Sequence, residues 1–170
     1  MPVGGGKTLS EARKPVIIER NGVKVAFLAY SQFAPQNPGL GVPAMAPLNP
    51  SYIKEDIAEA KKQASVVIVS LHWGTEYETS ASEEQKFIAR QIIDHGALLV
   101  IGHHPHVIQE VEEYGGGLIA YSLGNFIFDQ NFSEDTGKGM MLNVTVQNNK
   151  IKNYVPTTVR FTDRYQPFVE

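Results

Sequence analysis

The chain has 170 residues, 42% of them apolar, which is enough to build one ordinary domain over residues 1–170 with a sizeable core. The formal net charge of -3 at pH 7, without a run of like charges, gives no broad basic face, so nucleic acid is not an expected partner. The absence of cysteine excludes disulfides, thiolate metal sites and cysteine nucleophiles. Residues 1–6 do not resemble a signal peptide, and no apolar run reaches the roughly 18 residues of a membrane span, so we expect a soluble chain whose compartment stays open.

The first predicted element is a β-hairpin formed by residues 15–20 and 23–30. Between them stands Asn21-Gly22, the dipeptide that best tolerates the two positive φ values of a type I′ turn. Residues 26–29 are apolar on both faces, which is typical of an interior strand. Residues 31–49 contain four prolines and two glycines without a sustained period, which predicts a long irregular loop of a kind that is often functional.

A helix over residues 50–64 is predicted next. Asn49-Pro50 supplies its N-cap and its first helical position, and apolar residues then recur at helical spacing. A run of β-branched residues, 65–71, predicts a buried strand that ends at His72.

The same order of elements then repeats. Ser82 and Gln85 fit a capping box at the start of a helix over residues 82–95. The short apolar strand 97–101 follows, and we expect it to break at Gly102, directly before a group of histidines.

The rest of the chain predicts β structure, with residues 124–129 as a connecting segment. The expected strands are residues 107–114 and 118–123 around a glycine turn, and a hairpin-like pair, 140–147 and 150–161, around Asn148-Asn149. Helices and strands alternate first and strands dominate later, so the fold class is α/β, layered as helix-sheet-helix or helix-sheet-sheet.

The main candidate site is the histidine cluster that follows the second buried strand. His103, His104 and His106 lie within four positions in a chain with five histidines. Neutral imidazole is a good ligand for zinc, manganese and iron, and loops at the carboxyl ends of strands can aim several side chains at one point. We expect Pro105 to hold His104 in an extended backbone. The alternative is a solvated loop, or histidines that only form hydrogen bonds around a site.

Three further polar residues follow buried strands. His72 alone would more often be structural, but its position in the same kind of loop favours a metal ligand. Glu76 could accept a proton from a ligating imidazole or from substrate, or could be an ordinary surface residue. The amide of Asn125 could bind an oxyanion or a metal-bound water, or could simply form a turn. Trp73, Phe126 and Phe128 are interpreted as core residues, with lining of a cleft as the alternative.

Three motifs, in this order, resemble those of the CapA family of poly-γ-glutamate capsule synthesis proteins, which is similar to calcineurin-like metallophosphoesterases. They are Leu71-His72-Trp73-Gly74-x-Glu76-Tyr77, Gly102-His103-His104-Pro105-His106-Val107-Ile108-Gln109 and Tyr121-Ser122-Leu123-Gly124-Asn125-Phe126. The segment before the first hairpin, residues 11–15, also resembles that family.

The resemblance implies a layered β-sandwich flanked by helices, with two divalent metal ions at the strand ends. It implies that His72 and histidines of the 103–106 loop are ligands, and it leaves open whether His103 or His104 is the partner of His106. The Gly-Asp and Asn-x-Glu segments that open such domains have no counterpart in residues 1–170, so the chain resembles a C-terminal half of the domain.

Two functions are therefore expected. The first is a metal-dependent hydrolase-like protein of capsule synthesis or export, acting on an anionic phosphoester or on polyglutamate, with two metals activating a water. The second is a non-catalytic half-domain completed by another copy, a partner chain or its N-terminal half. Family members are usually tethered outside the cytoplasmic membrane, so any membrane anchor of this protein would precede residue 1.

Overall fold

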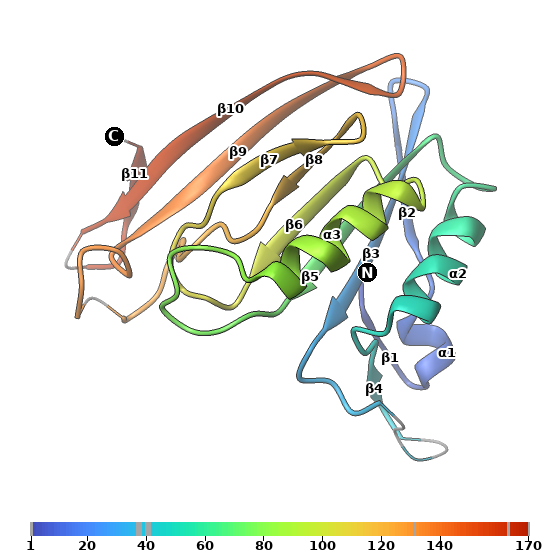
Figure 1. Ribbon diagram of the computed structural model, residues 1–170, viewed down its shortest axis with the longest axis horizontal. Coiled ribbons are helices and arrows are strands. Elements are labelled where there is room, and N and C mark those ends of the chain that lie inside the picture. The colour runs from blue at the N-terminus through green and yellow to red at the C-terminus, as the bar shows by residue number, and fades with distance from the viewer. Residues whose placement is uncertain (1, 37–38, 40–41, 131, 163, 170) are drawn as a thin grey trace.

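The computed structural model describes residues 2–36, 39, 42–130, 132–162 and 164–169 (Figure 1). Its centre is a six-stranded sheet with the order β2-β3-β5-β6-β8-β7. In that order the strands are β2 (Val16–Arg20), β3 (Val23–Ser31), β5 (Val66–His72), β6 (Leu99–His103), β8 (Gly117–Ala120) and β7 (Val111–Tyr114). The four central strands are parallel and the two outer ones antiparallel, which confirms the α/β class.

The parallel strands bring their carboxyl ends to one edge of the sheet. In the register, Ser31 of β3 lies beside His72 of β5, and His72 lies beside His103 of β6. Residues far apart in the sequence therefore meet at this edge, as open α/β sheets require of a site.

Two helices, α2 (Pro50–Ala60) and α3 (Glu83–Asp94), cover one face of the sheet (Figure 1). Val69 and Leu71 of β5, both 0% exposed, belong to the same apolar cluster as Ile57 of α2 and Ile92 of α3. On the opposite face, Phe27 is only half-buried. Neither helix, nor any other among the described residues, has the length and apolar character that crossing a membrane requires.

A second sheet contains β9 (Lys138–Gln147), β10 (Lys150–Phe161) and β11 (Pro167–Val169). Its long hairpin runs alongside the β7–β8 end of the large sheet, and β10 approaches β8 (Figure 1). Met140 and Val159 are buried there, at 8% and 2% exposure. The second layer is thus a sheet, which is the helix-sheet-sheet form of the expected layering.

Both predicted asparagine turns are confirmed. Asn21 and Gly22 have φ values of 52° and 76°, and Asn148 and Asn149 have values of 54° and 59°. These left-handed pairs match the type I′ geometry that follows the twist of the flanking strands. The capping box of Ser82 and Gln85 is also present at the start of α3.

The N-terminal region contains elements that the sequence did not predict. β1 (Gly5–Gly6) pairs with β4 (Ala44–Met45), and the short helix α1 (Leu9–Ala12) lies between them in sequence. Part of the predicted loop 31–49 is therefore a strand. Residues 37–38 and 40–41 of that loop, Pro38 among them, lie outside the described residues.

Gly102 does not break its strand, contrary to our expectation. β6 continues through Gly102 to His103, and a Cβ at position 102 would lie 1.7 Å from the carbonyl oxygen of Tyr121. Glycine is needed here because another backbone approaches closely, and not because the chain turns.

Two predicted boundaries also differ. The helix predicted to end at residue 64 ends at Ala60, because the polar residues 61–63 form the turn into β5. The strand predicted over 107–114 is reduced to β7, because the ladder is interrupted before Val111 and Ile108 pairs with Leu123 only in an isolated bridge.

Candidate metal centre

The candidate centre begins at the end of β5. The main chain continues the sheet for one residue, since Trp73 N–H donates to the carbonyl of His103 over 3.0 Å. The Trp73 side chain is 1% exposed, and its Nε1–H donates to the carbonyl of Tyr121 over 3.1 Å. The loop that carries Glu76 therefore starts from a fixed point directly after His72, and Trp73 is the core residue that we expected.

The 103–106 loop has an unusual backbone. His104 and His106 have φ values of 104° and 61°, in the left-handed region that non-glycine residues rarely adopt. The expectation that Pro105 keeps His104 extended was therefore wrong. The loop turns sharply instead, and Tyr77 N–H donates to the Pro105 carbonyl over 2.8 Å, which ties this loop to the one after β5.

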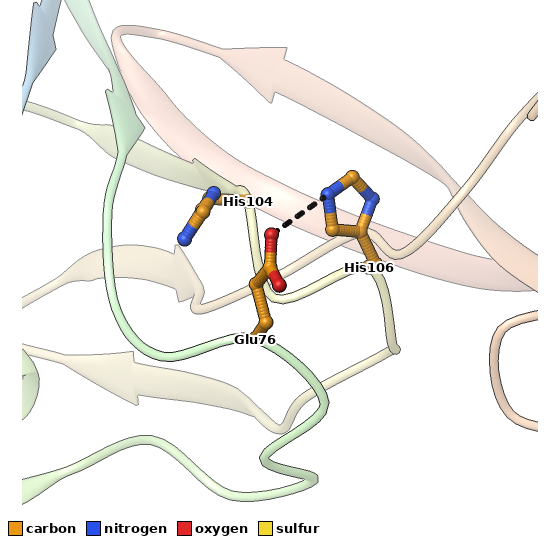
Figure 2. A group of neighbouring side chains, drawn as sticks. All are labelled: Glu76, His104 and His106. Carbon is orange, nitrogen blue, oxygen red and sulfur yellow. Dashed lines mark ion pairs between the residues drawn. The ribbon is translucent and has the colours of Figure 1, made fainter. Parts of the chain in front are cut away.

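Glu76, His104 and His106 come together at this edge. One ligand atom from each lies within 4.8 Å of the others, and Glu76 Oε1 is 3.9 Å from His106 Nε2. Figure 2 shows the Glu76 carboxylate pointing toward the space beside both imidazoles. Two imidazoles and a carboxylate form a donor set that suits zinc, manganese or iron, so the residues present fit the expected metal.

His72 lies next to this group but outside it, and His103, its neighbour in the sheet register, is not part of the group either. The rings of His72 and His104 have centroids 4.9 Å apart, and those of His104 and His106 are 5.9 Å apart. The sequence left open whether His103 or His104 is the partner of His106. In the structure, a ring nitrogen of His104 approaches His106 and Glu76.

Three of these histidines favour the neutral form. Partial desolvation lowers the pKa of His72, with a further contribution from His106. Burial and the neighbouring His72 lower the pKa of His103, and the same two causes lower that of His104, where Glu76 and His106 act more weakly and in opposite directions. Neutral imidazole is the form that binds metals, so within the Glu76, His104 and His106 group this shift favours the metal-binding form of His104.

Asn125 lies behind His106 and is 5% exposed. Its Oδ1 is 2.9 Å from His106 Nδ1, and its Nδ2–H donates to the carbonyl of Thr136 over 3.0 Å. The amide thus has partners within the protein at both ends. The hydrogen bond to the Thr136 carbonyl was not predicted from the sequence, because every residue type has a main-chain carbonyl.

Exposed rings surround the histidines. Phe33 lies 4.4 Å from His104 and Phe128 lies 4.9 Å from His106, measured between ring centroids. Phe128 and Phe126 are 39% and 54% exposed, so their interpretation as core residues was wrong. Phe33 was missed, although its loop follows β3, whose carboxyl end lies beside His72.

Solved structures of two other proteins have a similar fold. The chain resembles a hypothetical protein from Thermus thermophilus with a TM-score of 0.57, and a phosphatase from Mycoplasma pneumoniae with a TM-score of 0.55. These matches cover 92% of this chain at 13% and 14% identity, and 62% and 57% of the other chains. At this identity the likeness concerns the fold alone, which this chain shares with that phosphatase.

Sequence comparison supplies the family. Residues 1–130 match the family described as bacterial capsule synthesis protein PGA_cap, and the chain belongs to it. It is 40% identical over 137 residues to the PGA biosynthesis protein CapA of Bacillus subtilis (strain 168), and 36% identical over 137 residues to the capsule biosynthesis protein CapA of Bacillus anthracis. Both matches cover 77% of this chain but 35% and 33% of those relatives, so it spans about a third of their length. The resemblance inferred from the three motifs is confirmed.

Proposed function

We propose that this chain carries the histidine site of a metal-dependent, metallophosphatase-like hydrolase that acts in the synthesis or export of a poly-γ-glutamate capsule. The observation that carries the proposal is the convergence of Glu76, His104 and His106 at the carboxyl edge of a phosphatase-like sheet. Membership of the capsule synthesis family supports the biological role.

The chemistry follows from the donor set. His104 and His106 would hold a divalent zinc, manganese or iron ion, with Glu76 as a third ligand or as a proton acceptor beside it. Such an ion supplies Lewis-acid catalysis and an activated water for an anionic substrate, either a phosphoester or polyglutamate. His72, next to His104, is the candidate ligand toward a second ion.

A second candidate function has its own observation in its favour. Part of the sheet face opposite the helices is apolar and incompletely covered: Phe27 and Ile68 are half-buried, and Ile18 of the outer strand β2 is 53% exposed. A half-domain that binds a metal and needs further chain, or a partner, to complete a sandwich would cover this face. On either function we place the protein on the outer side of the cytoplasmic membrane, as its family resemblance implies.

Metal analysis tests the first proposal. The purified chain, incubated with zinc and then desalted, should retain zinc, and the double substitution His104→Ala/His106→Ala should abolish that retention. His95→Ala, a histidine at the end of α3, is the matched control and should retain zinc like the parent chain. Equal zinc content in the double variant and the parent would refute the site.

Activity assays and sedimentation separate the two functions. Phosphomonoesterase and phosphodiesterase activity in a monomeric chain would support the hydrolase and oppose the half-domain. Activity that appears only when the chain is extended to the length of its curated relatives, together with self-association of the short chain, would support the half-domain.

A further inference from the structure

Backbone contacts hold Asn125 in place on both sides. It follows Gly124, and its N–H donates to the carbonyl of Lys138 over 3.3 Å. On the other side, Gly139 packs so closely that a Cβ there would lie 2.1 Å from the Asn125 carbonyl oxygen. The side chain of Asn125 therefore extends from a backbone whose position is fixed.

The main chain determines which way this amide faces. The carbonyl of Thr136, 3.0 Å from Asn125 Nδ2, can only accept a hydrogen bond, so the NH2 group must face it. Asn125 Oδ1 then faces His106 Nδ1 at 2.9 Å. Because Oδ1 can also only accept, His106 must carry its proton on Nδ1 and donate it to Asn125.

This arrangement decides which nitrogen of His106 can bind a metal. A neutral imidazole has a single proton, so a proton on Nδ1 leaves the lone pair on Nε2. Nε2 is the atom that faces Glu76, 3.9 Å away. Outside a protein, neutral histidine prefers the opposite tautomer, with the proton on Nε2. In this chain the hydrogen bond to Asn125 Oδ1 therefore keeps the proton on Nδ1.

We propose that Asn125 is a positioning residue that fixes His106 in the Nδ1–H tautomer and directs the Nε2 lone pair into the candidate metal centre. The tautomer follows from the hydrogen bonds of the metal-free chain, and only its use as a ligand rests on the proposed function. Outer partners of this kind orient ligating histidines in metal sites and raise their basicity.

Long-range 1H–15N correlation spectra of the metal-free, 15N-labelled chain at pH 7.5 test the tautomer directly. In the parent chain, His106 Nδ1 should resonate as a protonated nitrogen and Nε2 as an unprotonated one. Asn125→Ala should shift His106 toward the Nε2–H form. Asn125→Asp loses the hydrogen bond to the Thr136 carbonyl but keeps an acceptor for His106 Nδ1, so it should keep the proton on Nδ1. Two variants that both lose the bond to Thr136 but differ in tautomer would separate the role of the acceptor from a loss of stability.

Zinc titration of the same variants tests the consequence. Asn125→Ala should weaken zinc binding by about 10–100-fold, while Asn143→Ala, at a position on β9, should leave it unchanged. A parent chain with the proton on Nε2, or an unchanged tautomer in Asn125→Ala, would overturn the inference. If the tautomers behave as expected but the parent chain binds no zinc, the proposed function fails and the role of Asn125 in orienting His106 stands.

Discussion

Strand β5 uses two neighbouring positions in opposite ways. Leu71 is 0% exposed and packs in the apolar cluster under the helices, while His72, one residue later, is exposed at the edge of the sheet. β6 repeats the contrast, because Val100 is 0% exposed and His103 is only partly buried. The strand interiors thus contribute burial, and the strand ends contribute side chains that can bind.

This contrast implies that stability and binding can be changed separately. Removal of apolar atoms from the interior lowers the free energy of unfolding, because buried apolar surface is lost and a cavity is left behind. Replacement of an exposed imidazole removes few packed atoms, so its effect should fall on metal binding.

The strongest test of the interior is Gly102→Ala. The new Cβ would meet the Tyr121 carbonyl at 1.7 Å and Trp73 Nε1 at 2.6 Å, and neither is a flexible group. We expect a loss of more than about 4 kcal/mol in the free energy of unfolding, or no folded protein at all. Denaturant titration measures it, and Gly5→Ala, where a Cβ would meet nothing within 4 Å, is the control.

Leu71→Ala should have the next largest effect, a loss of about 2–5 kcal/mol, because Leu71 is fully buried in a rigid core. Ile18→Ala, at a position 53% exposed on β2, should cost clearly less. Equal costs in chemical denaturation would show that a buried interior position contributes no more than an exposed one, and the role given to the strand interiors would be wrong.

Acidification should destabilise the metal-free chain. The pKa of His103 is lowered in the folded state, chiefly by burial, so below the unfolded value of about 6.5 the unfolded chain binds more protons than the folded one. The free energy of unfolding should therefore fall as the pH drops below about 6.5 and stay level above it. His103→Gln should flatten this slope. A stability that rises on acidification to about pH 5.5 would contradict the direction.

The smallest expected change in stability is in the loop directly after β6. His104 has a φ of 104°, which glycine adopts without penalty, so His104→Gly should leave stability unchanged or raise it by about 1 kcal/mol. Zinc affinity of the same variant should fall by about tenfold or more, because a candidate ligand is lost. If stability and affinity fell together, the separation of interior from edge would be wrong at this residue.

Local signals explain what was predictable from the sequence. Asn21-Gly22 and the capping box of Ser82 and Gln85 depend on four or fewer consecutive residues, and each forms as expected. The histidines were found because buried β-branched runs stop directly before them. The alternation of helices and strands predicted the α/β class, and the family motifs then implied the layered sandwich.

Contacts between distant segments explain what was not predictable. β1 and β4 pair across about forty residues, and three of the four paired residues are glycine or alanine, which are depleted in strands. The requirement for glycine at position 102 depends on the carbonyl of Tyr121, which only the folded sheet places there. The joining of Asn125 to His106 depends in the same way on the turn that contains Thr136.

Trp73 offers a spectroscopic consequence of this architecture. The sequence contains one tryptophan, and it lies stacked on Tyr121 with ring centroids 6.3 Å apart, directly before the loop that carries Glu76. Its intrinsic fluorescence therefore originates at the base of the candidate centre and needs no engineered label. A paramagnetic ion such as Mn2+ in that centre should quench the emission, whereas Zn2+ should not, so the chain carries its own optical probe of which metal it has bound.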